Sequence, residues 1–546
     1  MYAELLLLHG TDHGLASKLS SAAFRLRRYP TDVTAMPRAE LTAQFQPEIV
    51  RLIEQLSKKG TIDDLDELIQ LTPPGLFDMM RIRGLGGKKL SVLWKTAGID
   101  NMEQLLQAAK NNELSTIPGF GKKTQDNIIT AIESLHKHEH FFHYASVADS
   151  AIELVQKMND LFPDHLTDLC GSIRRETTTV DAIEIITSIP YKQLAGKKLK
   201  KFLILQSYED DISKAHTFDE FPVIIYHTEK ERFYLQLFER TGTEAHVKIV
   251  KNKIKGKITP ATEQDLYKRA NLPYIVPEMR ENNAEWDFKG EAKDLLTLSD
   301  IKGVVHNHTT WSDGVDSLED FAKACKKRKF QYCVISDHSK NAHYAGGLKE
   351  EKVIRQWEKI DRLNKQMASF KIFKSIECDI LISGELDYDE NLLKGFDMVI
   401  VSIHQLLKMN EEKATKRLIR AVENPYTTIL GHMTGRQLLI RPGYPVNFKK
   451  VIDACAANNV IIEINANPYR LDMDWSHIPY ALKKGVMISV NPDAHSIHEI
   501  ENIRWGVSAA RKGGLTKQMT WNALTLEQIE RWLKKKAHAI SSFKFN

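Results

Sequence analysis

From residue 302 almost to its end, the chain alternates short apolar runs with amphipathic stretches of helical period, and metal-binding side chains stand where the apolar runs stop. This alternation predicts a parallel (βα) barrel, in which the carboxyl ends of all strands meet at one rim. We therefore expect one cluster of histidines and acids from distant parts of the sequence: His306, His308, Asp313, His338, Glu377, His404, His432, Asp493 and His495.

Six of the eight histidines between residues 302 and 496 belong to this set. A single histidine at a strand end more often packs or faces solvent, but six of them beside three acids favour a polynuclear metal site. The H-x-H at His306 and His308 places two imidazoles on one side of a strand end, and Asp493 with His495 repeats that spacing. Nine ligands suffice for two or three ions, with Glu377 as the expected bridge.

The ligand types restrict the metal and the chemistry. Imidazole and carboxylate ligands without thiolate suit Mn²⁺, Zn²⁺ or Fe²⁺ and argue against Mg²⁺ alone. Such ions activate a shared water for attack on a phosphoester, so the nine ligands are also the predicted catalytic residues. Lys340, Arg436 and Arg470 lie just beyond strand ends and are candidates for binding substrate phosphates, with simple rim charges as the equal alternative.

Two glycine turns lie earlier in the chain, RGLGGKK at 83–89 and PGFGKK at 118–123. Each combines a G-x-G turn with two lysines and a following amphipathic helix, so that free backbone N–H groups at a helix start can bind a phosphate. A pair of such hairpins predicts sequence-nonspecific binding of the DNA backbone, with helix packing alone as the alternative. The predicted contacts are Gly84, Gly86, Lys88, Lys89, Gly119, Gly121, Lys122 and Lys123.

Residues 171–188, GSIRRETTTVDAIEIITS, resemble the palm signature of family X DNA polymerases, and RTGTEAHVKI and DLYKRANLPYIVPEMRE resemble later segments of that family. The barrel block is similar to the polymerase and histidinol phosphatase (PHP) domain. The whole chain thus resembles bacterial family X polymerases with a C-terminal PHP domain. That resemblance implies three metal ions held by the nine residues above in a distorted seven-stranded barrel, with manganese-dependent 3′–5′ exonuclease or related end-processing activity. Val304 departs from the family, which often has aspartate there.

The resemblance implies a multidomain chain with four parts. These are an N-terminal helical domain at 1–72, an all-α helix-hairpin-helix domain at 73–140, an α+β nucleotidyltransferase-like palm and thumb at 141–290, and the α/β PHP barrel at 300–546. The segment MPRAELTAQFQPEIV lacks the G-x-G hairpin that the family usually has in the first part, so we do not expect a 5′-phosphate to bind there.

The palm lacks the acids that nucleotidyl transfer requires. The first two family aspartates fall at Ala182 and Glu184, and the later strand near 223–225 has no acid. Asp181 lies three residues from Glu184, on the opposite face of a strand. Because polymerases need carboxylates that converge on two metal ions, we expect no polymerase activity. Ser172, Arg174 and Arg175 remain candidates for phosphate binding, with packing or solvation as the equal alternative.

Composition adds little to these motifs. The net charge of +5 over 546 residues requires any DNA-binding surface to be local, and the five cysteines form no C-x-x-C pair. No stretch has the length of a membrane span, so we expect a cytoplasmic protein, without a membrane partner and monomeric. The predicted function is a metal-dependent DNA phosphoesterase of DNA repair. The alternatives are a histidinol-phosphatase-like enzyme for a small molecule, a non-enzymatic DNA-binding scaffold and a gap-filling polymerase.

Overall fold

The computed structural model describes residues 1–26, 33–82, 84–196, 199 and 202–543. Arg83, at the start of the first glycine turn, therefore lies outside the described residues. The chain divides into two compact units, Met1–Glu139 and His140–Asn546. The finer four-part division stays a prediction. Among the described residues, no helix combines the length and the apolar character needed to cross a membrane.

The first unit is helical, and its buried core contains Leu5, Leu76, Leu90, Leu105 and Ile132. Gly60, with a left-handed backbone, ends the helix at Pro47–Lys59, and the next helix begins at Asp63. The helices of this unit are α1 (Tyr2–His9), α2 (His13–Leu26), α3 (Arg38–Gln44), α4 (Pro47–Lys59), α5 (Asp63–Leu71), α6 (Pro74–Met79), α7 (Gly87–Ala97), α8 (Met102–Lys110) and α9 (Lys122–His138).

The second unit begins with a five-stranded sheet in the order β2-β4-β7-β6-β5 and a separate β1-β3 pair. Within this sheet β4 and β7 are neighbouring parallel strands. The strands are β1 (Phe142–His143), β2 (Thr167–Leu169), β3 (Thr179–Val180), β4 (Ile183–Thr187), β5 (Ile204–Glu209), β6 (Ile212–His216) and β7 (Pro222–His227). The helices are α10 (Tyr144–Leu161), α11 (Gly171–Arg174), α12 (Tyr191–Leu194), α13 (Phe233–Thr241), α14 (Glu244–Lys253) and α15 (Glu263–Arg269).

The rest of the second unit is the expected barrel, built on seven parallel strands in sequence order from β8 to β14. The strands are β8 (Gly303–Asn307), β9 (Tyr332–Ile335), β10 (Lys371–Asp379), β11 (Met398–Ser402), β12 (Thr427–Leu430), β13 (Ile461–Asn465) and β14 (Ile488–Asn491). The helices are α16 (Leu318–Lys327), α17 (Glu350–Gln366), α18 (Glu390–Leu393), α19 (Glu411–Val422), α20 (Phe448–Ala457), α21 (Ile478–Lys483), α22 (Ile503–Lys512) and α23 (Leu526–Phe543).

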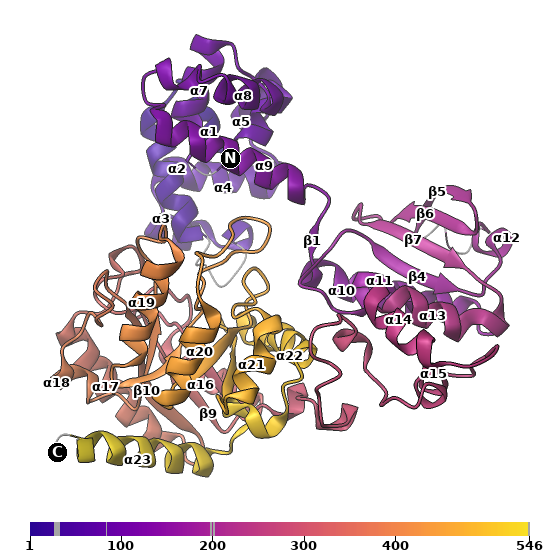
Figure 1. Cartoon of the computed structure of the whole chain (residues 1–546). Helices are drawn as coiled ribbons and strands as arrows, with labels where there is room; N and C mark the ends of the chain where they lie inside the picture. Colours follow the sequence, from indigo (N-terminus) through magenta and orange to yellow (C-terminus); the bar gives the residue numbers. More distant parts are fainter. Residues whose placement is uncertain (27–32, 83, 197–198, 200–201, 544–546) are drawn as a thin grey trace. The chain divides into compact units, whose positions relative to one another are not determined.

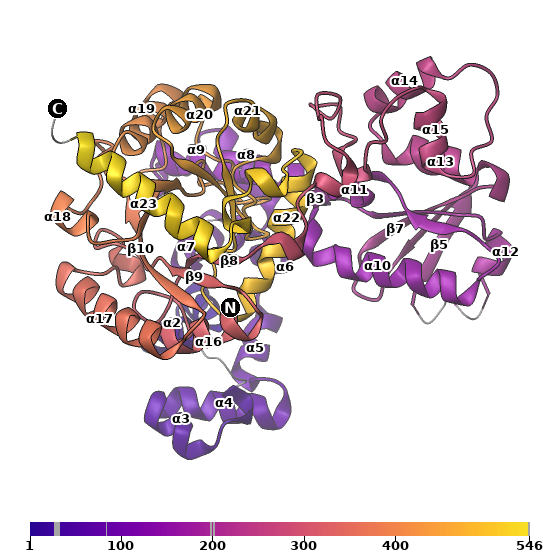
Figure 2. The same cartoon turned by 90° about the horizontal axis from the view of Figure 1, so that it is seen from below.

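The barrel is nearly closed. A parallel bridge joins Asn307, at the end of β8, to Ala494, just after β14. Strand residues such as Val305 and Ile400 pack into an apolar core with Trp521 and with Ile529 of α23. Figure 1 shows helices packed around the strands, and Figure 2, seen from below, shows α23 crossing the barrel. The predicted fold class, with a helical hairpin region, a mixed α+β region and a (βα)₇ barrel, is confirmed.

Candidate metal centre

The carboxyl ends of the barrel strands bring all nine predicted ligands together. Four overlapping groups have candidate ligand atoms within 4.8 Å of one another. They are His308, Asp313, His338 and His495; His306, Glu377 and His432; His306, His308 and Asp493; and His338, Glu377 and His404. The parallel arrangement explains this convergence, because every ligand lies within β8 or β10 or follows a strand at the same rim.

Glu377 lies at the middle of this cluster. Its Oε1 atom is 2.9 Å from Nε2 of His432, 3.1 Å from Nε2 of His404 and 3.3 Å from Nε2 of His306. Its Oε2 atom is 3.0 Å from Nδ1 of His338. Burial opposes ionisation of this carboxyl group, yet the surrounding imidazoles hold its pKa well below the usual range. A carboxylate with a histidine against each oxygen has the position of a bridging ligand.

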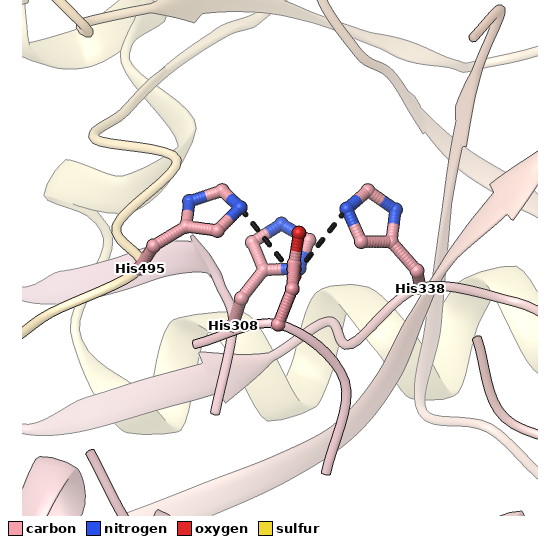
Figure 3. Close-up of side chains that lie close together, drawn as sticks. His308, His338 and His495 are labelled. Carbon is pink, nitrogen blue, oxygen red and sulfur yellow. Dashed lines mark ion pairs between the residues drawn. The ribbon is translucent and has the colours of Figure 1, made fainter. Parts of the chain in front are cut away.

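Asp313 organises the outer part of the cluster. One carboxylate oxygen lies 3.6 Å from Nε2 of His338, 3.6 Å from Nε2 of His495 and 3.8 Å from Nδ1 of His308. Figure 3 shows the three imidazoles gathered around a carboxylate, and its dashed lines mark ion pairs between imidazoles and this carboxylate. Three histidines and one acid thus surround a second centre beside that of Glu377.

The two H-x-H-like motifs do not follow regular strand geometry. The register of β8 against β9 shifts between Val304 and Asn307, and His306 has a φ of 63°. Asp493 has a φ of 51°. Residues other than glycine rarely adopt this left-handed backbone region. Backbone strain of this kind is concentrated at functional sites. His306 and His308 share one of the four groups, the one that also contains Asp493. Each of the two also belongs to one further group without the other.

The donor atoms fit metal ions. Among the described residues, buried ring nitrogens of four ligands make no hydrogen bond: His306 Nε2, His308 Nδ1 and Nε2, His338 Nδ1 and His432 Nδ1. Buried polar atoms are normally hydrogen-bonded, so atoms without a hydrogen bond that face acids indicate a cation between them. Burial together with His495 and His338 lowers the pKa of His308 to about 3, whereas neighbouring acids raise the pKa of His404 to about 10.

Other acids around the cluster position its histidines. Glu463 accepts a hydrogen bond from Nδ1 of His306 at 2.6 Å, and Asp379 lies 2.5 Å from Nδ1 of His404. Buried Asp337 accepts hydrogen bonds from the backbone N–H groups of Thr309 and Ser312, which fixes the loop that carries Asp313. Asp337 and Glu463 also stand at strand ends with a metal-type side chain, but neither they nor Asp379 are among the nine predicted ligands.

The three predicted phosphate-binding cations differ in their surroundings. Arg470 reaches the cluster, with Nε 4.0 Å from Oδ2 of Asp493. Arg436 instead donates to Asp474 at 2.6 Å and to the carbonyl oxygen of Arg470 at 2.8 Å. Lys340 pairs with Glu350 at 2.6 Å. Among the three, the structure brings only Arg470 to the candidate ligands.

The three predicted phosphate-binding residues of the palm all have internal partners. The backbone N–H of Ser172 donates to Glu184 at 2.9 Å. Arg174 makes two hydrogen bonds to Glu263, at 3.0 and 2.6 Å. Arg175 donates to Glu281 at 3.2 Å and to the carbonyl oxygen of Thr241 at 2.8 Å.

The acid positions of the palm are as the sequence indicates. Ala182 is buried and precedes β4, Asp181 is exposed, and Glu184 is paired with Ile224 across β4 and β7. The tyrosine hydroxyl of Tyr226 also lies 3.4 Å from the Glu184 carboxylate. Glu184 is therefore held by internal hydrogen bonds, without a second carboxylate at Ala182 or Ile224.

The glycine hairpins stand at the starts of α7 and α9. Gly84 and Gly119 have φ values of 90° and 89°, which glycine adopts without strain. Gly86 and Gly121 are the N-cap residues of α7 and α9, and Lys88, Lys122 and Lys123 are exposed while Lys89 is half-buried. In the first hairpin, the backbone N–H of Gly87 donates to the Glu4 carboxylate at 2.5 Å. An internal acid thus already caps one of the two helix starts.

Comparisons with known proteins agree with this architecture. A family model of the PHP domain matches residues 305–467, and a model of the SAM-like helix-hairpin-helix tandem matches residues 77–134. Over 270 residues the chain is 26% identical to a probable phosphatase of Caldanaerobacter subterraneus subsp. tengcongensis, which covers 46% of this chain and 97% of the relative. A probable phosphatase of Thermoanaerobacter sp. strain X514 is 27% identical over 252 residues, which cover 43% of this chain and 95% of the relative.

The similarity to one further relative covers most of the chain. The DNA polymerase/3′-5′ exonuclease PolX of Bacillus subtilis strain 168 is 31% identical over 506 residues, which cover 89% of each protein. The barrel is thus a hydrolase domain of the PHP phosphoesterase type. A region that matches the helix-hairpin-helix family precedes it in the sequence. The chain belongs to the PolX family of family X DNA polymerases with a C-terminal PHP domain.

Proposed function

We propose that this protein is a metal-dependent 3′–5′ exonuclease or end-processing phosphoesterase of DNA repair, and that its polymerase activity is lost. The observation that carries the proposal is the convergence of nine imidazole and carboxylate side chains, Glu377 and Asp313 among them, at one barrel rim. The nine predicted ligands hold two or three ions of Mn²⁺, Zn²⁺ or Fe²⁺. When bound, these ions lower the pKa of water and neutralise charge on a phosphodiester.

The residues of the chain supply position and orientation for this chemistry. Glu463 and Asp379 orient His306 and His404, so that the opposite ring nitrogens face Glu377. Arg470, beside Asp493, binds a substrate phosphate through its guanidinium. Arg436 takes a positioning role instead, because its side chain holds the Arg470 backbone.

In this proposal the other parts of the chain bind and position the DNA. The hairpins at Gly84–Gly86 and Gly119–Gly121 contact backbone phosphates without reading bases, as their exposed turns and lysines suggest. The region at 73–140, which carries both hairpins, binds the substrate, the region at 141–290 acts as a scaffold, and the region at 300–546 hydrolyses the strand. We propose a monomer that acts on DNA in the cytoplasm.

Loss of polymerase activity is proposed from the palm geometry. Ala182 and Ile224 stand where carboxylates are required, and Glu184 already accepts hydrogen bonds from Ser172 and Tyr226. A single carboxylate with internal partners cannot hold two ions for nucleotidyl transfer. Arg174 and Arg175 also pair with Glu263 and Glu281, so their guanidinium groups stabilise the fold.

The experiment is to incubate the purified chain with Mn²⁺ and an end-labelled primer-template, with and without nucleotides. We expect the primer to shorten from its 3′ end, and shortening to stop in His308→Ala but continue in His498→Ala, an exposed histidine outside the cluster. Shortening that persists in His308→Ala would contradict the proposed site. Lengthening that requires nucleotides would contradict the proposed loss of polymerase activity.

A histidinol-phosphatase-like enzyme for a small molecule is the second candidate, because less than half of this chain matches nearly the full length of two probable phosphatases. The DNA-binding hairpins favour the first candidate. Rapid hydrolysis of p-nitrophenyl phosphate in Mn²⁺, without cleavage of any DNA substrate, would favour the second.

A further inference from the structure

The two glycine hairpins of the helical unit have the same backbone conformation but different neighbours. Gly84 and Gly119, the first glycine of each G-x-G turn, have φ values of 90° and 89°. Gly86 and Gly121, the N-cap residues of α7 and α9, are both extended, with φ values of −78° and −60°. Any difference between the hairpins in phosphate binding must therefore come from the groups that surround them.

Helix α1 covers the first hairpin. The backbone N–H of Gly87, the first residue of α7, donates to Oε2 of Glu4 at 2.5 Å. α1 packs against α7 (Figure 1), and a Cβ atom on Gly87 would collide with the carbonyl oxygen of Glu4. A Cβ atom on Gly86 would lie 3.2 Å from the Glu4 carboxylate. Glu4 thus supplies the first hairpin with the anion that a helix N-terminus favours.

The second hairpin is open. A Cβ atom on Gly121 would meet no atom within 4 Å. Lys122 and Lys123, the first two residues of α9, are exposed, and among the described residues no group accepts a hydrogen bond from their backbone N–H groups. The Nζ atom of Lys89, in the first hairpin, lies 5.9 Å from the centre of the Phe120 ring in the second. Two free N–H groups and a lysine of the other hairpin thus lie at the second turn.

We propose that Glu4 takes the place of a phosphate at the first hairpin, so that the backbone N–H groups of the second hairpin alone bind a DNA phosphate. The first hairpin then contributes through the side chains of Lys88 and Lys89. A phosphate that approached the N–H of Gly87 would have to displace the Glu4 carboxylate, and a phosphate beside it would meet a like charge. This inference rests on the proposed binding of DNA and specifies which hairpin takes a phosphate. It also makes Glu4 a residue that lowers the affinity for DNA.

The test compares Gly121→Ala with Gly86→Ala in the full-length protein, by fluorescence anisotropy of a labelled DNA duplex whose phosphorothioate ends slow cleavage. Both glycines are N-cap residues with a backbone that alanine adopts, so the two variants share the small cost of alanine at an N-cap. We expect Gly121→Ala to weaken binding about tenfold, because its methyl group keeps a phosphate away from the free N–H groups and removes a hydrogen bond to a charged group. We expect Gly86→Ala to weaken binding much less. Thermal unfolding verifies that both variants are folded.

Glu4→Gln removes the carboxylate charge, so we expect it to raise DNA affinity severalfold and to lower the thermal midpoint. Glu67→Gln, at an exposed site on α5, is the charge-matched control.

Equal losses of affinity in the two glycine variants, or an unchanged affinity in Gly121→Ala, would overturn the inference. An unchanged or lower affinity in Glu4→Gln, or an equal gain in Glu67→Gln, would do the same. If the wild-type protein does not bind the duplex, the proposed DNA-binding function fails. If it binds the duplex and the two glycine variants behave alike, this inference alone fails.

Discussion

Glu463 lies 2.6 Å from Nδ1 of His306, and both side chains are buried. This hydrogen bond assigns the proton of His306 to Nδ1. The other ring nitrogen, Nε2, then carries the lone pair that can bind a metal ion, and it lies 3.3 Å from Glu377. Asp379 holds His404 in the same manner at 2.5 Å. Two acids outside the ligand set therefore determine the orientation of two ligands.

Glu463→Gln is expected to weaken metal binding by about 10- to 100-fold without abolishing activity, because the amide fixes the imidazole less well than a carboxylate. Titration of DNA cleavage with Mn²⁺ measures the change. The Mn²⁺ concentration that gives half of the maximal cleavage rate rises, whereas the rate at saturating Mn²⁺ largely recovers. Glu385→Gln is the control, since Glu385 is exposed and pairs with Arg420. An unaltered Mn²⁺ requirement in Glu463→Gln would contradict this role.

Replacing Lys122 and Lys123 together by alanine is expected to lower affinity for DNA equally across sequences. Removing one lysine that neutralises a phosphate reduces the slope of log affinity against log salt by about 0.7 to 0.9, so the slope falls by up to about 2. Fluorescence anisotropy at several salt concentrations gives that slope. Alanine at Lys58 and Lys59, the end of α4, serves as the charge-matched control. An equal change of slope in both variants would argue against a specific role of the hairpin.

Ala182→Asp is expected not to restore nucleotide addition, although it replaces the first missing carboxylate. Ile224 still stands beside Glu184, and Glu184 remains bound to the Ser172 N–H. Primer extension with Mn²⁺ and all four nucleotides, in the presence of His308→Ala to suppress shortening, checks this expectation. Efficient extension by the Ala182→Asp, His308→Ala protein would show that the palm retains a usable site.

Lys512 joins the barrel helix α22 to residues within 141–290, and its side chain is fully buried. Its ammonium group donates to Glu281 at 2.7 Å and to the carbonyl oxygens of Arg175 and Glu278 at 2.6 and 3.0 Å. Lys512→Met leaves these acceptors without their buried donor, so we expect the free energy of unfolding to fall by about 3 kcal/mol. Thermal unfolding should show a lower midpoint than for wild type, whereas Lys534→Met, at an exposed site on α23, keeps the midpoint.

The sequence predicted the barrel and its ligands because strand-end histidines and acids follow the topology of parallel strands. It could not predict the left-handed backbone at His306 and Asp493, which depends on register and closure of the barrel. The roles of Glu463 and Asp379 were also missed, because an acid that orients a ligand has the same residue type and strand-end position as a ligand. Arg174 and Arg175 illustrate the same limit, since their partners Glu263 and Glu281 lie far away in the sequence.

The metal content of purified wild-type protein and of Glu377→Ala, measured by inductively coupled plasma mass spectrometry after equilibration with Mn²⁺, tests the central claim most directly. Glu377 belongs to two of the four ligand groups and lies against the histidines of both. We predict two or three ions per wild-type chain and the loss of at least one in Glu377→Ala, together with loss of DNA cleavage. A wild-type chain without bound ions that still cleaves DNA, or an unchanged metal content in the variant, would contradict the account.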